Sequence, residues 1–331
     1  MSKQRKIVIT TELSRRCNIR CPHCIVMASP RHHHKISMKN LYHIIDEVSA
    51  GKEYSHLINF TGGEPFLALD RLKKTLSYAH RAGVRIALVT NGFWAESLKK
   101  ARAVLNELKN VYLINISWDY YHQRFIPLKY VINAANACLE KGVKVAIRGI
   151  HFGFTKKDAE KARLYYRKII GPLDKRIRIV SIPFILGGHA EQIIDRLPVR
   201  LVTKVPNSRR CEKILRTIFI SSYGEVYPCC CNLFCVKKTK NVILGNINET
   251  PLDNIIEKAK KGFLPNFILK YGIAELIKLI SSIKGKDFTK KYYTDIQKDD
   301  QCQVCSRILD DDSIISLFGK MAGKKNSRWY N

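Results

Sequence analysis

The chain of 331 residues lacks the long apolar segments that a membrane protein requires. No uninterrupted apolar run approaches the roughly 18 residues that cross a bilayer. Near the N-terminus, the apolar run Ile7-Val8-Ile9 is too short for the core of a secretion signal. We therefore expect a soluble cytoplasmic protein. Hydrophobic residues make up 46% of the chain, which excludes disorder of the chain as a whole.

Acidic residues are also scarce: the chain has 28 Asp and Glu and 58 Lys and Arg. The formal net charge of +30 predicts a positive field that favours anionic partners such as nucleic acid, an acidic peptide or phosphate groups. The cations are spread along the chain, so a lysine-rich solvated surface without a specific partner is an equal alternative.

Cysteine, by contrast, occurs 11 times. In a reducing cytoplasm that number favours metal binding over a disulfide framework.

The first two thirds of the chain alternate between apolar strand-like and amphipathic helix-like segments. Strands are predicted at residues 5–12, 57–61, 85–90, 111–117, 144–149 and 176–181. Helices are predicted between them, at residues 38–50, 70–82, 94–108, 128–141 and 156–169. Such alternation predicts an α/β fold with parallel strands and right-handed crossovers. Six units make a partial (β/α)₆ TIM-like barrel, two short of a closed one.

After about residue 205 the alternation stops. We expect a core domain at 1–205, a cysteine-rich domain with lysine-rich helices at 206–312, and a basic, frayed tail at 313–331. Within the second domain, residues 218–220 and 225–227 flank a turn and predict a hairpin.

Three cysteines follow the first predicted strand as C-x-x-x-C-x-x-C, at Cys17, Cys21 and Cys24. Thiolates are soft ligands that suit iron–sulfur clusters or zinc. A zinc site would need a fourth ligand, for which His23 or one of His32, His33 and His34 is available. A four-iron cluster held by three cysteines would instead leave one iron with open positions for a substrate or cofactor.

Here the chain resembles the radical S-adenosylmethionine (SAM) superfamily, in which this spacing follows the first strand of a partial barrel. A second motif, Thr61-Gly62-Gly63-Glu64-Pro65, ends the second predicted strand and resembles the family's glycine-rich segment. The resemblance implies a SAM-binding [4Fe–4S] cluster. It also implies further SAM contacts: Gly62, Gly63, Glu64 and Pro65 with the amino group, Ser117 and Asp119 near the ribose, and Arg148 with the carboxylate.

A second cysteine group reads C-x₁₂-G-x₄-C … C-x-x-C, with Cys211, Gly224, Cys229, Cys302 and Cys305. It resembles the SPASM/twitch extension of radical SAM enzymes, which implies an auxiliary [4Fe–4S] cluster held by those four cysteines. A zinc ribbon with the same thiolates is the alternative. The surplus cysteines are Cys138, predicted to lie in the core, and Cys230, Cys231 and Cys235. One of Cys230 and Cys231 could ligate the cluster in place of Cys229, donate a hydrogen atom to a substrate radical, or only pack the loop.

The resemblance further implies reductive cleavage of SAM to a 5′-deoxyadenosyl radical, which abstracts a hydrogen atom from the substrate. We expect a ribosomally synthesised peptide as substrate, modified by epimerisation or by a thioether or carbon–carbon crosslink, and the positive charge of the chain favours an acidic one. The lysine-rich helices at 252–298 could supply a surface for it. The alternatives are a small-molecule alcohol dehydrogenase of the twitch type and RNA modification, although no RNA-binding module is recognisable. A one-electron reductant such as ferredoxin or flavodoxin is the other expected partner.

Overall fold

The computed structural model describes residues 6–153, 156–185, 187–196, 211–230, 242–293 and 301–321. Its strands are β1 Ile7–Glu12, β2 Tyr54–Thr61, β3 Arg85–Thr90, β4 Val111–Ser117, β5 Lys144–His151, β6 Arg178–Pro183, β7 Thr217–Ile220, β8 Glu225–Tyr227 and β9 Gly245–Asn246. Its α-helices are α1 Met38–Ala50, α2 Leu69–Arg81, α3 Leu98–Glu107, α4 Leu128–Glu140, α5 Lys156–Ile170, α6 Leu252–Lys260, α7 Phe263–Tyr271, α8 Ile273–Lys284, α9 Lys286–Tyr293, α10 Gln301–Leu309 and α11 Asp312–Met321. Three 3₁₀ segments are η1 Pro65–Ala68, η2 His122–Arg124 and η3 Gly188–Arg196.

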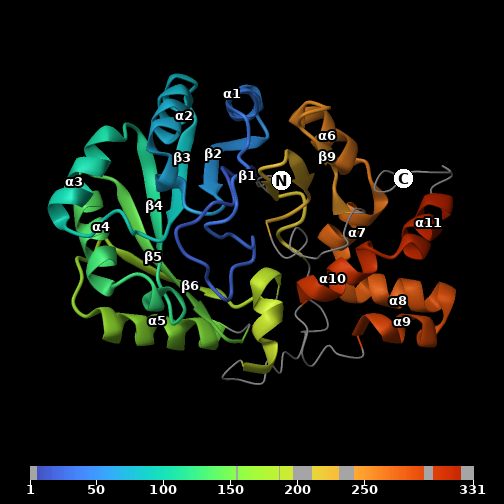
Figure 1. Ribbon diagram of the computed structural model, residues 1–331. Helices are drawn as coiled ribbons and strands as arrows, with labels where there is room; N and C mark the ends of the chain where they lie inside the picture. The colour runs from blue at the N-terminus through green and yellow to red at the C-terminus, as the bar shows by residue number, and fades with distance from the viewer. Residues whose placement is uncertain are drawn as a thin grey trace.

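One curved sheet organises the molecule, in the order β6-β5-β4-β3-β2-β1-β7-β8-β9. Strands β1 to β6 are all parallel, as the alternation predicts. Ile86, Ala87 and Leu88 of β3 are completely buried, because a parallel sheet is covered on both faces. Helices α2 to α5 lie along the outside of this part of the sheet (Figure 1). The partial (β/α)₆ barrel is therefore confirmed.

Local sequence explains the helices that cover the barrel. In α1, the apolar residues Leu41, Ile44, Ile45 and Val48 recur at helical spacing and all four are buried. The helix begins after Ser37, whose hydroxyl accepts a hydrogen bond from the Asn40 amide and so satisfies one of the free N–H groups of the first turn.

The cysteine-rich part continues the barrel sheet instead of forming a sheet of its own. Strand β7 pairs in parallel with β1, with Ile9 opposite Ile218, and then turns into the antiparallel β8 as the predicted hairpin. The sequence analysis does not predict the pairing with β1, because the two strands are separated by about two hundred residues of chain. The loop after β1 therefore lies between the barrel and the hairpin (Figure 1).

The C-terminal residues differ from the frayed tail expected at 313–331. Residues 312–321 form α11, in which Ile314 and Phe318 are buried. Phe318 stacks on Phe263 of α7 with ring centroids 5.1 Å apart. Apolar residues at helical spacing therefore anchor this segment, although no acidic residue follows Asp312. Residues 322–331 lie outside the described ranges.

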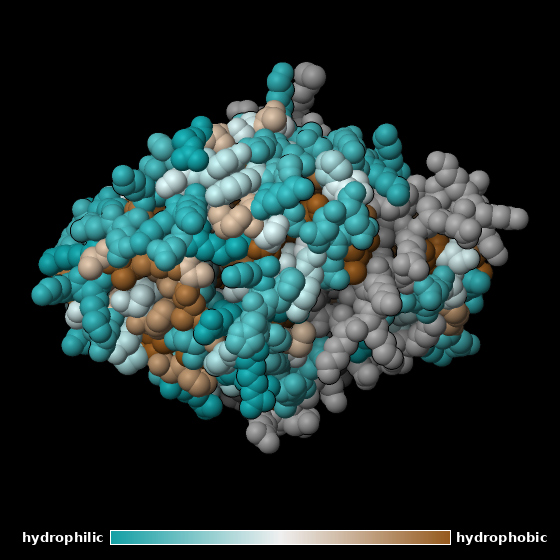
Figure 2. Space-filling model, turned by 45° about the horizontal axis from the view of Figure 1, so that its top comes forward, coloured by the Kyte–Doolittle hydropathy of each residue, from teal (hydrophilic) through white to brown (hydrophobic). Residues whose placement is uncertain are grey.

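No helix in the described ranges is both long and apolar enough to span a bilayer. On the face shown in Figure 2, hydrophilic residues cover most of the surface, and apolar residues show only in small areas between them.

Candidate active site

The three cysteines of the loop after β1 form one buried group. Cys17 and Cys21 are 7% and 6% exposed. Burial raises the pKa of all three thiols, that of Cys17 to about 12. Each of Cys17 and Cys21 has its pKa raised further by the charge of other thiols in the group, so the three sulfurs lie within electrostatic reach of one another. Deprotonation at neutral pH therefore requires a metal cation at this position.

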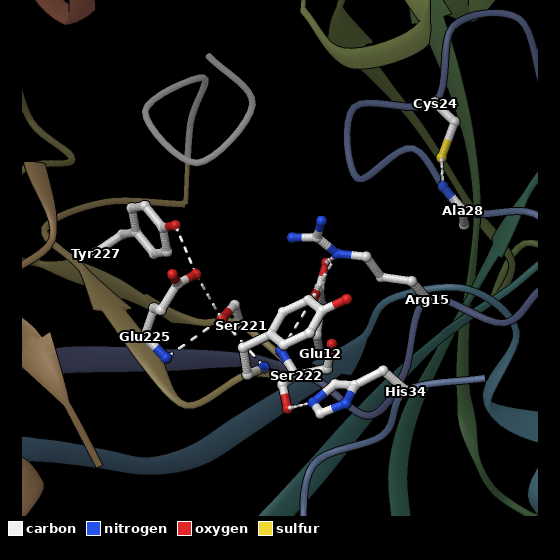
Figure 3. A network of polar contacts seen from close by, with 10 residues as sticks. Glu12, Arg15, Cys24, Ala28, His34, Ser221, Ser222, Glu225 and Tyr227 are labelled. Carbon is white, nitrogen blue, oxygen red and sulfur yellow. Dashed lines mark hydrogen bonds and ion pairs between the residues drawn. The ribbon is translucent and has the colours of Figure 1, made fainter. Parts of the chain in front are cut away.

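The three sulfurs are not as close together as the ligands of one tetrahedral ion would be. A tetrahedral zinc ion, with Zn–S bonds of about 2.3 Å, would hold its sulfurs roughly 3.8 Å apart. Within the described ranges, the three cysteines do not form a set whose ligand atoms all lie within 4.8 Å of one another. One sulfur also has a backbone donor, because the Ala28 amide donates to Cys24 Sγ at 3.4 Å (Figure 3).

The glycine pair after β2 lies directly against the cysteine loop. A Cβ on Gly62 would come within 2.2 Å of the Ser14 carbonyl oxygen, and a Cβ on Gly63 within 1.9 Å of the Arg16 carbonyl oxygen. The Gly63 amide donates to Ser14 O at 2.7 Å, and the Glu64 amide donates to Arg16 O at 2.9 Å. Glycine is therefore required here by backbone packing against the cysteine loop.

The Glu64 carboxylate ties the end of β2 to the end of β3. Its oxygens accept hydrogen bonds from the Phe66 amide at 3.1 Å, the Thr90 hydroxyl at 2.8 Å and the Asn91 amide at 2.7 Å. Burial raises the pKa of Glu64 to about 7, although these hydrogen bonds lower it in part. Asn91 extends the network, because its side-chain amide donates to Asn18 Oδ1 at 2.9 Å within the cysteine loop.

Asp119, after β4, connects the cysteine loop to η2. Its Oδ1 accepts from the amides of Tyr121 and His122 at 2.9 and 3.1 Å. Its Oδ2 lies 3.4 Å from His23 Nε2 and 2.9 Å from His122 Nδ1. Burial would raise the pKa of Asp119, but the two histidines lower it strongly overall.

These contacts hold Asp119 between the cysteine loop and η2. A contact between Asp119 and the ribose stays a prediction. His23, Asp119 and His122 place their ligand atoms within 4.8 Å of one another, a donor set that could hold a divalent metal ion. His23 also stacks on Tyr121, with centroids 4.7 Å apart.

Arg148 lies in β5, where the sequence analysis places a SAM carboxylate contact. It pairs in register with Ser117 of β4, so the two predicted SAM contacts are neighbours in the sheet. Burial lowers the pKa of Arg148, and the Cys230 thiol raises it in part. Cys230, which follows β8 in sequence, therefore lies within electrostatic reach of Arg148 in the barrel strand β5.

The loop after β6 supports the cysteine loop from another side. The His189 amide donates to Cys24 O at 3.0 Å, and His189 Nδ1 lies 3.2 Å from Cys21 O. A Cβ on Gly188 would meet Cys24 O at 2.6 Å, so this glycine allows the two backbones to approach.

A polar network that the sequence analysis did not predict joins the cysteine loop to the β7–β8 turn (Figure 3). The buried Glu12 carboxylate accepts from Arg15 Nε at 3.2 Å and from the Ser222 amide at 2.9 Å. His34 Nε2 lies 2.9 Å from Ser222 O, and the His34 ring stacks on Tyr223 with centroids 4.0 Å apart. His34 therefore contacts the turn, and His23 contacts Asp119, so neither is placed as a fourth ligand of the cysteine group.

The second cysteine group comes from three separate segments. Cys211 precedes β7, Cys229 is buried just after β8, and Cys302 and Cys305 lie one turn apart on α10, where side chains three residues apart share a face. Burial raises the pKa of the surplus Cys138 to about 12, and this residue lies in the core as predicted. Cys231 and Cys235 lie outside the described ranges.

Comparison with known proteins agrees with this architecture. Residues 11–166 match the radical SAM superfamily, and residues 211–270 match the SPASM iron–sulfur cluster-binding domain. The chain therefore belongs to the radical SAM superfamily and carries a SPASM-type domain after its barrel. An enzyme of this class binds SAM and a [4Fe–4S] cluster in the barrel, and auxiliary iron–sulfur chemistry resides in the second domain.

Individual relatives span different shares of the chain. YydG of Bacillus subtilis (strain 168), named for a role in peptide biosynthesis, is 23% identical over 94% of both chains. Fe-coproporphyrin III synthase of Methanosarcina barkeri (strain Fusaro / DSM 804) is 31% identical over 44% of this chain and 37% of its own length. Among solved structures, native anSMEcpe with bound AdoMet and Cp18Cys peptide shares the fold at a TM-score of 0.52, with 16% identity over 98% of this chain and 92% of that one.

Proposed function

We propose that this radical SAM enzyme modifies a ribosomally synthesised peptide. The observation that supports this most is the similarity to YydG, which extends over 94% of both chains and therefore includes the barrel and the second domain. A fold shared with a structure that holds a peptide beside AdoMet is compatible with such a substrate. When bound, the cluster and SAM together supply the reductive chemistry that removes a hydrogen atom from the substrate.

We assign the ligands from the positions of the cysteines. Cys17, Cys21 and Cys24 would hold the SAM-binding cluster, and Cys211, Cys229, Cys302 and Cys305 the auxiliary cluster. The Gly62–Pro65 segment would accept hydrogen bonds from the SAM amino group through its carbonyls, because the Gly63 and Glu64 amides already donate within the protein. Arg148 would pair with the SAM carboxylate, and Ser117 would lie near the ribose.

Iron analysis tests this assignment. Two four-iron clusters predict about eight irons per chain, and replacing Cys17, Cys21 and Cys24 with Ala should leave about four and abolish SAM cleavage. Protein that binds zinc in place of iron after anaerobic reconstitution would contradict it.

For the reaction we propose epimerisation, with Cys230 as hydrogen-atom donor. The Cys230 thiol lies within electrostatic reach of Arg148, the residue of β5 expected to contact the SAM carboxylate. After a hydrogen atom leaves the substrate α-carbon, the Cys230 S–H would return a hydrogen atom from the other face. The sulfur then needs one electron and one proton to become a thiol again, and the one-electron reductant supplies the electron.

Deuterium incorporation separates this reaction from the alternatives. In deuterated water the wild-type enzyme should place deuterium on the epimerised α-carbon, because the thiol hydrogen exchanges with solvent. Cys230→Ala should lose the deuterated product while SAM cleavage continues. Cys230→Ser is the matched variant, since an O–H bond is too strong to donate to a carbon radical. Full product formation in both variants would instead favour crosslinking or oxidation.

A further inference from the structure

The loop that carries the SAM-cluster cysteines presents an unusual outer surface. No Asp or Glu occurs between Glu12 and Asp46. Five cations in this stretch are exposed; Lys39 lies on α1, and the other four, Arg16, Arg20, Arg31 and Lys35, lie in the loop before it. We call these four residues the cationic rim. In the part of the chain that the structure describes, none of them forms an ion pair.

Elsewhere on the molecule, exposed cations commonly have an acidic neighbour. Arg102 forms a two-point contact with Glu140, and Lys278 lies 2.7 Å from Glu275. Lys260 of α6, in the lysine-rich region expected to bind a peptide, lies near both Glu53 and Glu257, at 3.2 and 2.6 Å. In the rim, the Arg20 guanidinium lies 3.5 Å from the neutral side-chain oxygen of Gln192. The positive charge of the rim is therefore directed to solvent.

Two rim residues are also next in sequence to the cysteines that are expected to hold the SAM-binding cluster. Arg16 precedes Cys17 and Arg20 precedes Cys21, and neighbouring Cα atoms are about 3.8 Å apart. Cys17 and Cys21 are 7% and 6% exposed, so the rest of the chain does not cover them completely. A protein that contacts these two arginines therefore lies close to the cluster sulfurs.

We propose that the cationic rim is the docking surface for an acidic one-electron donor protein. SAM cleavage in this class requires an electron at the cluster, and a donor must approach closely to deliver it. Complementary charge speeds such encounters without a large permanent interface, which suits transient electron transfer. The proposal depends on the radical SAM class of the enzyme and not on the nature of its substrate.

The experiment measures SAM cleavage by the reconstituted holoenzyme as a function of the concentration of reduced flavodoxin, without peptide. The rim variant is Arg20→Glu/Arg31→Glu/Lys35→Glu. The matched control is Lys99→Glu/Lys109→Glu/Lys141→Glu, which makes the same charge change at exposed positions on or beside α3 and α4. Dithionite, a small reductant, measures cluster integrity in each protein.

The rim variant should show an apparent KM for flavodoxin raised about tenfold or more, since steering changes association rates by one to three orders of magnitude. The control variant should match wild type, and the dithionite rates of all three proteins should agree. The wild-type KM should rise with salt, and the rim variant should lose most of this dependence. Equal flavodoxin KM values for the rim and control variants would overturn the proposal.

If the rim variant also loses its dithionite rate, carbodiimide cross-linking of wild-type holoenzyme to flavodoxin decides the question. Cross-links from flavodoxin carboxylates to Lys35 would support the proposal. Cross-links confined to lysines elsewhere would overturn it.

Discussion

Replacement of Gly63 by alanine should detach the SAM cluster while leaving most of the molecule folded. The new Cβ would lie 1.9 Å from the Arg16 carbonyl oxygen and 2.4 Å from the Arg16 carbonyl carbon. Backbone atoms cannot rotate away as the end of a side chain can. The cysteine loop must therefore move away from the end of β2.

The magnitude follows from the contacts that this movement breaks. Two backbone hydrogen bonds hold the segments together, from Gly63 to Ser14 and from Glu64 to Arg16. At about 1 kcal/mol each, with a further 1–3 kcal/mol for overpacking, the loss is about 3–5 kcal/mol. In a domain of this size that corresponds to a decrease in Tm of roughly 6–10 °C.

Iron content and SAM cleavage measure whether Gly63→Ala disrupts the SAM-cluster site. Gly63→Ala should hold about four irons per chain instead of about eight, because the second cysteine group is carried by other segments of the chain, before β7, after β8 and on α10. Gly83→Ala is the control. Gly83 lies in the turn between α2 and β3, has φ +71° and has nothing within 4 Å of the added Cβ. It should cost only about 1–2 kcal/mol of backbone strain and retain all its iron.

A Gly63→Ala protein with full iron content and normal SAM cleavage would refute the reasoning. It would show that the cysteine loop is not held in place by its contact with the segment after β2.

Two further predictions concern the pH response and the substrate side. Glu64 has a folded-state pKa raised to about 7 from 4.5, so the folded state binds its proton more tightly, and the free energy of unfolding falls as pH rises through this window. In cluster-free protein the wild type should lose about 2.5 kcal/mol between pH 5 and pH 8 relative to Glu64→Gln, as measured by denaturant unfolding; parallel pH profiles would contradict this. Phe125, 44% exposed after η2, should contact a peptide substrate, so Phe125→Ala should raise the peptide KM several-fold with little change in kcat; an unchanged KM would exclude such a contact.

The periodic parts of the fold were predictable from the sequence because each unit carries its own local signal. The spacing of Leu41, Ile44, Ile45 and Val48 predicts α1 with its observed bounds. The strands of the barrel are short runs of aliphatic residues, and alternation with helices requires them to be parallel. Residue type and spacing likewise identified both cysteine groups.

The contacts between distant segments could not be predicted in the same way. The position of Asp119 after β4 predicts a ligand contact, but it does not predict that the carboxylate lies next to His23 and His122. Residues 313–321 of the expected tail belong to the packed helix α11, because the lack of acidic residues said nothing about the apolar residues Ile314 and Phe318. Such outcomes depend on which side chains the fold brings together, and no local pattern encodes that.

The pairing of β7 with β1 has the largest consequence for function. The cysteine loop begins where β1 ends, and the β7–β8 turn begins where its neighbour β7 ends. Because the two strands are parallel and adjacent, their carboxyl ends lie side by side. Glu12 at the end of β1 accepts a hydrogen bond from the Ser222 amide in the turn, and His34 of the cysteine loop stacks on Tyr223. The same hairpin leads to Cys229, which bridges to Thr217 at the start of β7, so a single strand pairing joins the segment that holds Cys229 and Cys230 to the barrel sheet.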